Sequence, residues 1–234
     1  MRVQAGAACL VAAAVALSGC AEAEPGSSAD PREEADIRIL VDSQDTEGQV
    51  VAEIFKQAFA RNDRNAELVV EDNTAGSSLV EKMGEEGNFW AACTGDALYA
   101  LDPDRAREME QDFTAGEAGR DEDRNGQTHI AMMESLPTTL TTVDPSTAQG
   151  CSASPASELP QNYSPIFTKG LLDREEKEML GSLSKFLIEQ DIDELVEEVE
   201  SGDGDIEKVV SRWSQNSVPE GELDANSDSD STEE

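Results

Sequence analysis

The chain has 234 residues, with 51 Asp and Glu against 17 Lys and Arg, and its formal net charge is −34. This charge argues against nucleic-acid binding, because affinity for nucleic acids comes largely from Lys and Arg side chains that contact phosphates. It also argues against docking on anionic lipid through a basic face.

The first twenty residues predict an exported lipoprotein. Arg2 precedes an uninterrupted apolar run at 7–17, which is shorter than the about 20 residues that a transmembrane helix needs and has the length of a secretory signal. The letters LSGC at 17–20 resemble the bacterial lipobox. This resemblance implies that residues 1–19 are removed as a signal peptide and that Cys20 carries acyl chains such as palmitate. The protein would then be anchored by lipid on the extracytoplasmic face of the cell membrane. The alternative is that Cys20 is a buried thiol at the end of a short helix, which would need a partner core.

Two acidic segments flank the predicted folded domain. Residues 20–36 show no apolar periodicity and are expected to form a flexible tether. Residues 217–234 contain seven acidic residues and no basic one, which predicts a disordered, solvated tail. Residues 37–216 remain, enough for one core of ordinary size or for two small lobes.

The first half of this domain is expected to alternate strands and helices. The β-branched run at 37–42 predicts a strand. Residues 43–62 predict a helix, with Asp45 or Thr46 as its N-cap. Its apolar stripe comprises Val50, Val51, Ile54, Phe55, Ala58 and Phe59. A second strand is expected at 66–72.

The same alternation continues along the chain. We expect a turn and a short helix at 73–87, a third strand at 88–95, and a helix at 95–112 that is broken near Pro103. Short connections between alternating strands and helices predict a parallel sheet with right-handed crossovers.

The second half is less regular. Residues 114–127 are expected to form a polar loop, and the Thr, Ser and Pro residues that follow indicate irregular structure with one short helix and one strand. The C-terminal third is expected to be a returning strand followed by three helices, at 162–170, 171–190, 191–202 and 205–213. The predicted fold class is therefore α/β with C-terminal helices.

The cysteines indicate one disulfide. Cys9 lies in the signal segment and Cys20 is expected to carry lipid, so Cys93 and Cys151 remain as an even pair. In an exported protein such a pair is expected to form a disulfide. Closing a loop of this length would stabilise the fold by about 4 kcal/mol in the chain-entropy model. Two distant thiols and the single His129 lack the spacing of zinc ligands. We expect no metal, no cofactor and no catalysis, since the sequence contains no nucleophile elbow, P-loop or His-paired nucleophile.

Three blocks of sequence, in order, resemble the substrate-binding lipoproteins of osmoprotectant ABC importers, which bind glycine betaine, choline, proline betaine or carnitine. The blocks are IRILVDSQDTEGQVVAEIFKQAF, NFWAACTGDALYALDP, and the segment from LPQNYSPIFTKG to SRW. The resemblance implies a periplasmic-binding-protein-like fold, with a parallel βαβαβ first lobe in a domain at 37–216. The family's second lobe is replaced by a short crossover within 128–162, so we expect that lobe to be truncated.

The resemblance also implies a binding site in the loops after the strands of the first lobe. The implied ligand-binding residues are Ser43, Gln44, Asp45, Thr74, Gly76, Ser77, Thr94, Gly95, Asp96, Asn162 and Tyr163. The alternative for several of them is structural: Asp45, Thr46 and Ser77 could cap helices, and Thr94 and Gly95 could turn the chain. A quaternary ammonium is held by aromatic faces. Tyr99 and Tyr163 are the candidates, since the remaining rings are expected in the core or mid-strand.

Two functions follow. The first is a membrane-anchored solute-binding component of an ABC importer for betaine- or choline-type osmoprotectants, with a quaternary-ammonium ligand and a permease subunit as partners. The second is a degenerate, non-catalytic envelope lipoprotein that binds a protein partner or modulates a transporter.

Overall fold

The computed structural model describes five stretches of the chain: 35–72, 76–115, 123–151, 158–202 and 205–217. The predicted signal peptide, Cys20, nearly all of the tether and the acidic tail lie outside these residues, and so does Thr74. Among the helices within the described stretches, none combines the length and apolar character that crossing a membrane requires.

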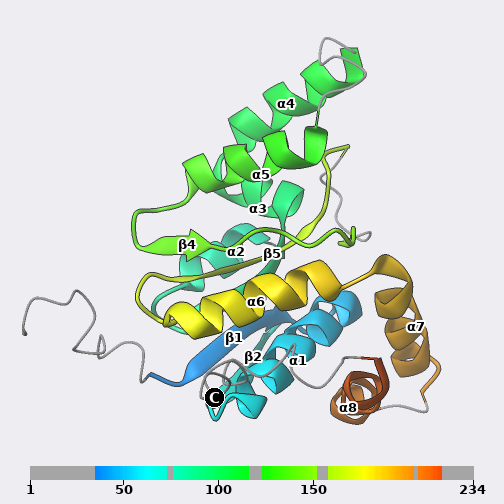
Figure 1. The fold of residues 1–234 in the computed structure, drawn as a ribbon. Coiled ribbons are helices and arrows are strands. Elements are labelled where there is room, and N and C mark those ends of the chain that lie inside the picture. The colour runs from blue at the N-terminus through cyan, green and yellow to red at the C-terminus, as the bar shows by residue number, and fades with distance from the viewer. Residues whose placement is uncertain (1–34, 73–75, 116–122, 152–157, 203–204, 218–234) are drawn as a thin grey trace, which may run out of the picture.

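The described residues form five strands and eight helices (Figure 1). In chain order they are β1 (Ile37–Asp42), α1 (Thr46–Arg61), β2 (Ala66–Glu71), α2 (Gly76–Lys82), β3 (Phe89–Cys93), α3 (Thr94–Leu101), α4 (Pro103–Ala115), α5 (Arg124–Ser135), β4 (Leu140–Thr142), β5 (Tyr163–Thr168), α6 (Arg174–Phe186), α7 (Glu189–Glu200) and α8 (Ile206–Ser217).

The strands form one sheet in the order β2-β1-β3-β5-β4. β1 pairs in parallel with both β2 and β3, which confirms the predicted parallel βαβαβ unit. β5 runs antiparallel to β3 and to β4. The antiparallel register places Cys93, the last residue of β3, opposite Tyr163, the first residue of β5.

Helices cover both faces of the sheet, because its central strands carry apolar side chains alternately on each face. In β3, Phe89, Ala91 and Cys93 join the core shared with α1, α6, α7 and α8. Trp90 and Ala92 join the core shared with α2, α3, α4 and α5. Figure 1 shows the two helical layers on either side of the sheet.

An aromatic cluster occupies the first of these cores. The ring centroid of Phe89 lies 5.5 Å from that of Phe55, 5.5 Å from that of Phe59 and 6.1 Å from that of Phe167. The apolar stripe predicted for α1 is therefore its buried face. In the same layer Phe186 and Trp213 pack against this core with their ring centroids 6.3 Å apart.

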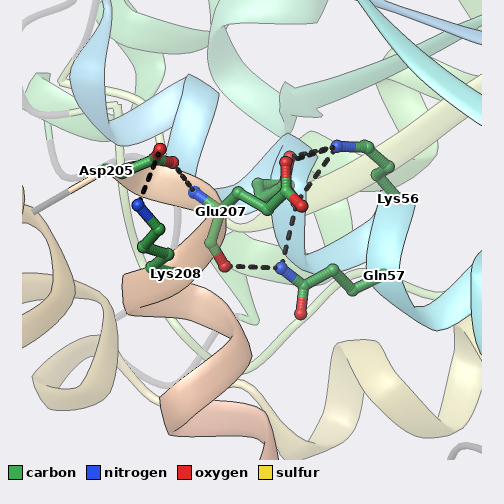
Figure 2. A network of polar contacts seen from close by, with 6 residues as sticks. Lys56, Gln57, Asp205, Glu207 and Lys208 are labelled. Carbon is green, nitrogen blue, oxygen red and sulfur yellow. Dashed lines mark hydrogen bonds and ion pairs between the residues drawn. The ribbon is translucent and has the colours of Figure 1, made fainter.

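Polar contacts fasten α8 to α1 (Figure 2). Gln57 Nε2 donates to the backbone oxygen of Glu207 over 2.9 Å and to Glu53 Oε1 over 3.0 Å. The Lys56 ammonium lies 3.1 Å from a Glu53 oxygen and 3.7 Å from a Glu207 oxygen. Lys56 thus bridges acidic groups of two helices, and Val209 and Val210 of α8 are buried beside this contact.

One helix begins where a loop was expected. α5 starts at Arg124, inside the predicted polar loop at 114–127. Asp123 caps it by accepting a 2.9 Å hydrogen bond from the backbone N–H of Gly126, and Arg124 donates to the backbone oxygen of Phe113 over 3.0 Å. The prediction was wrong here because charged residues and a glycine mask the few buried positions of α5, which are Thr128, His129, Ala131 and Met132.

The chain between β4 and β5 is short. We call residues 143–151 and 158–162 the connecting segment, and these residues contain no helix or strand beyond one isolated bridge between Gln149 and Asn162. α5 and β4, which precede it, belong to the layers of the single sheet described above. The described residues of the connecting segment therefore add no helix or strand to the sheet or its two helical layers.

Candidate functional site

The candidate site lies at the edge of the sheet where β1 and β3 end and β5 begins. We call this edge the rim and define it as residues 42–47, 93–96 and the connecting segment. The carboxyl ends of parallel strands meet at one edge of a sheet, which is where open α/β folds place ligands. The antiparallel β5 brings its first residues to the same edge, opposite the end of β3.

Most of the predicted site residues are found at the rim. After β1 come Ser43, Gln44 and Asp45, and α3 begins with Thr94, Gly95 and Asp96. Asn162 directly precedes β5, which begins at Tyr163. Ser77 lies in α2, but the structure does not describe its side chain. Thr74 lies outside the described residues. The structure therefore brings together residues from three separate parts of the sequence.

The backbone amides at the start of α3 are occupied by the connecting segment. The N–H of Thr94 donates to Asn162 O over 2.9 Å, and that of Gly95 donates to Pro160 O over 3.1 Å. The N–H of Asp96 donates to Gln161 Oε1 over 3.0 Å. The first amides of a helix are the groups that bind anions. Here the chain's own oxygens take their place.

The Thr94 hydroxyl is also committed to this contact. It donates to Pro160 O over 2.9 Å and accepts from the N–H of Asn162 over 3.2 Å. A Cβ at Gly95 would lie 2.9 Å from Pro160 O and 2.9 Å from the Cβ of Leu159, closer than such atoms approach. Thr94 and Gly95 therefore contact the connecting segment closely, Thr94 through its backbone and hydroxyl and Gly95 through its backbone.

A second set of contacts joins the connecting segment to α1. The Tyr163 hydroxyl and the backbone N–H of Cys151 both donate to Glu47 Oε1. Cys151 is disulfide-bonded to Cys93, with their Cα atoms 6.2 Å apart. Gly150 donates its N–H to Gln161 O over 2.8 Å. We call these contacts of Glu47, Cys93, Gly150, Cys151 and Tyr163 the clasp.

Ser146 and Asn162 complete the attachment. Ser146 exchanges hydrogen bonds with the backbone of Tyr163, its N–H donating to Tyr163 O over 2.7 Å and its Oγ accepting from Tyr163 N over 2.9 Å. Asn162 Nδ2 donates to Ser146 O over 3.1 Å, whereas its buried Oδ1 has no hydrogen-bond partner among the described residues. The first part of the connecting segment is thus hydrogen-bonded to β5, and residues 160–162 are hydrogen-bonded to α3.

The rim is negatively charged. Burial raises the pKa of the Asp45 carboxyl, a hydrogen bond from the Gly48 N–H partly opposes this, and the negative charges of Glu47, Asp42 and Asp96 raise it further. Burial, and then the charge of Glu47 and the hydrogen bond to it, raise the pKa of Tyr163. Tyr163 therefore stays protonated and donates to Glu47. The charges that act on Asp45 are all carboxylates, so the rim favours a positively charged group over a negatively charged one.

The two tyrosines expected to face a ligand do not present open rings at the rim. Tyr163 is 1% exposed and packs within the core. Tyr99 lies in α3, and the Arg107 guanidinium covers its ring at 5.6 Å from the centroid. The aromatic contribution expected from the resemblance therefore has no counterpart in these two side chains.

No metal-binding cluster of His, Cys, Asp or Glu is found in the part of the chain that the structure describes. His129 of α5 is only 7% exposed. Burial lowers its pKa, and the nearby charge of Asp144 partly opposes this. Within the described part of the chain, its Nδ1 has no hydrogen-bond partner.

Sequence reasoning missed Glu47, Ser146 and Gln161. Glu47 reads as an acidic residue in the first turn of a helix, where the helix dipole alone accounts for it. Ser146 and Gln161 lie in a Ser- and Pro-rich stretch without periodicity. The sequence signal that could have found this region is the Gly150–Cys151 pair, because a glycine beside a bonded cysteine marks a close approach of the backbone.

Comparison with solved structures identifies a protein of similar fold. No protein-family model matches the chain, and no curated protein matches its sequence. A solved structure described as "Crystal structure of glycine betaine/carnitine/choline ABC transporter" aligns with a TM-score of 0.55 at 10% sequence identity, covering 77% of this chain and 98% of that one. The chain has the α/β fold of a periplasmic binding protein. At this identity the likeness shows the fold alone, and the neighbour is described as a transporter protein.

Proposed function

We propose that this protein is a solute-binding component of an ABC importer, anchored by lipid on the extracytoplasmic face of the membrane. The observation that carries the proposal is the fold shared with a solved protein described as a glycine betaine/carnitine/choline ABC transporter. The predicted signal peptide and acylated Cys20 support the location, and a permease subunit is the partner that such a component serves.

The chemistry of the rim narrows the solute. Glycine betaine and carnitine each carry a carboxylate, which needs N–H donors, whereas choline carries only a positive charge and a hydroxyl. The amides of Thr94, Gly95 and Asp96 are already bonded within the chain. The carboxylates around Asp45 attract a cation. We therefore propose a quaternary ammonium without a carboxylate, of which choline is the simplest, as the preferred solute.

Isothermal titration of the mature protein with choline, glycine betaine and carnitine tests this proposal. We expect choline to bind more tightly than either zwitterion, with an affinity that falls as salt screens the rim charges. Asp45→Asn, which keeps an acceptor for the helix cap, should weaken choline binding, and Asp104→Asn on the exposed surface of α4 is the matched control. Binding of glycine betaine alone would contradict the charge argument. Absence of measurable binding to all three solutes would contradict solute binding.

A second function is favoured by one specific observation. The connecting segment fills the rim with the chain's own hydrogen bonds, which supports an envelope lipoprotein that binds a protein partner or modulates a transporter. Cross-linking of the full chain in its native membrane discriminates the two. A permease subunit recovered together with choline binding supports the first function, and a partner recovered without any solute binding supports the second.

The lipid anchor has its own test. Cys20→Ser should abolish incorporation of labelled palmitate and move the protein from the membrane to the soluble fraction. Cys9→Ser, inside the segment expected to be removed, is the matched control and should leave both unchanged. Membrane retention and acylation of Cys20→Ser would contradict the anchor.

A further inference from the structure

We propose that the Cys93–Cys151 disulfide is a redox-sensitive latch that holds the connecting segment across the start of α3. The disulfide joins the end of β3 to the part of the connecting segment that lies beside α1. Its reduction would free the connecting segment from α3 without dismantling the sheet. This property is independent of which solute or partner the protein binds.

The hydrogen bonds of the connecting segment transmit the hold of the disulfide to α3. Gly150, next to Cys151, donates to Gln161 O over 2.8 Å, and Gln149 pairs with Asn162 in an isolated bridge. The side-chain oxygen of Gln161 accepts a hydrogen bond from the N–H of Asp96, and the backbone oxygen of Asn162 accepts one from the N–H of Thr94. Residues next to the disulfide are therefore hydrogen-bonded to the residues that accept hydrogen bonds from the first amides of α3.

The backbone at Cys151 gives the latch a bias toward opening. Cys151 has φ 53°, in the left-handed region, which is unfavourable for a residue other than glycine. The disulfide and the hydrogen bond from its N–H to Glu47 hold it there. Once the disulfide is broken, only non-covalent contacts oppose relaxation of this residue.

The two sulfurs differ in accessibility. Cys93 is completely buried, whereas Cys151 is partly exposed. A thiolate of a dithiol reductant attacks Cys151 Sγ, the S–S bond breaks, and Cys93 leaves as a thiolate that takes up a proton. The second thiol of the reductant then displaces Cys151 from the mixed disulfide. The reductant ends as a disulfide, and the protein ends with two thiols.

Hydrogen exchange of the mature chain, with and without dithiothreitol and without denaturant, tests the latch. We expect reduction to speed exchange of the Thr94, Gly95 and Asp96 amides by about tenfold or more, since local opening sets their exchange. The amides of Leu40 and Val41 in the central strand β1 exchange through unfolding of the whole domain, so they should remain more strongly protected than the α3 amides. Cys93→Ser/Cys151→Ser should exchange like the reduced protein, with no response to dithiothreitol.

Alkylation followed by mass spectrometry reports on the disulfide itself, so reduction is measured independently of opening. Free thiols with unchanged α3 amides would overturn the proposal, as would equal exchange rates of the β1 and α3 amides after reduction, because the disulfide would then support the whole fold. A disulfide that dithiothreitol cannot reduce without denaturant would overturn it too. If the double variant fails to fold, reduction of the wild-type chain still decides. Solute titration does not enter this test, so its failure is separate from that of the proposed function.

Discussion

Gly150→Ala should destabilise the protein, because the clasp leaves no room for a side chain at this position. A Cβ on Gly150 would overlap the hydroxyl and ring of Tyr163 and the carboxylate of Glu47. These groups are held in place, since the Tyr163 hydroxyl donates to Glu47 and its ring lies in the core. The added methyl group must therefore displace Tyr163 or lift the connecting segment away from it.

The magnitude follows from the two contacts at stake. Overpacking a well-filled site costs about 1–3 kcal/mol, and losing a hydrogen bond to a charged group costs about 1.5–3 kcal/mol. We expect Gly150→Ala to lower the free energy of unfolding by about 3 kcal/mol, which for a domain of this size lowers the Tm by about 6–12 °C. Urea unfolding followed by circular dichroism measures the change.

Gly181→Ala is the matched control. Gly181 lies inside α6, and a Cβ there would meet nothing within 4 Å. The same substitution should therefore stabilise the protein by about 0.5–1 kcal/mol, because alanine loses less backbone entropy in a helix than glycine does. Gly150→Ala with wild-type stability, or a loss equal in both variants, would refute the packing of Gly150 against Tyr163 and Glu47.

Substitutions at three further places, the disulfide, Asp45 and the Arg64–Glu176 pair, have measurable consequences. Replacing both Cys93 and Cys151 with Ser should lower the free energy of unfolding by about 4 kcal/mol for a separation of 58 residues; an unchanged urea midpoint would contradict this. Asp45→Ala should cost about 1 kcal/mol through loss of the α1 cap, whereas Asp45→Asn keeps the cap and removes a repelled charge. The folded protein raises the pKa of Asp45 above 3.8, so the carboxyl binds its proton more tightly in the folded than in the unfolded state. Asp45→Asn should therefore increase the free energy of unfolding at neutral pH, and this increase should disappear below pH 3.8 when unfolding is measured as a function of pH. Arg64→Leu should cost about 3 kcal/mol, since it strands the buried Glu176 carboxylate that Arg64 contacts at 2.9 Å; Glu176→Gln in the same background should recover part of the loss in thermal unfolding.

The first half of the fold could be predicted from the sequence because its patterns are local and strong. The stripe of α1 recurs at helical spacing, and the break at Pro103 ends one helix and begins the next, with Pro103 as the first residue of α4. Proline fits this position since it has no N–H to leave unbonded. A short helix was expected after residue 127, but the start of α5 at Arg124 was not, because a charged segment with a glycine hides the few buried positions of its first turns.

The sequence predicted that the candidate site residues lie together at one edge of the sheet, but not what their hydrogen-bonding groups contact. Strand ends identify Thr94, Gly95 and Asn162 as rim residues, since the carboxyl ends of β1 and β3 lie at one edge. Whether their hydrogen-bonding groups face a ligand or the chain itself depends on the conformation of residues 158–162. That segment has no periodicity, and its contacts with α3 span more than sixty positions of sequence.

The order of the strands governs when the molecule can fold as its chain is synthesised. β3, at Phe89–Cys93, has β1 on one side, but its other neighbour is β5 at Tyr163–Thr168. A chain that emerges from its N-terminus can assemble β2, β1 and β3 early, while the far side of β3 waits for β5 with its backbone groups unpaired. An open strand edge of this kind invites association with other chains. The nascent protein should therefore depend most on chaperones in the interval between the emergence of α3 and that of β5.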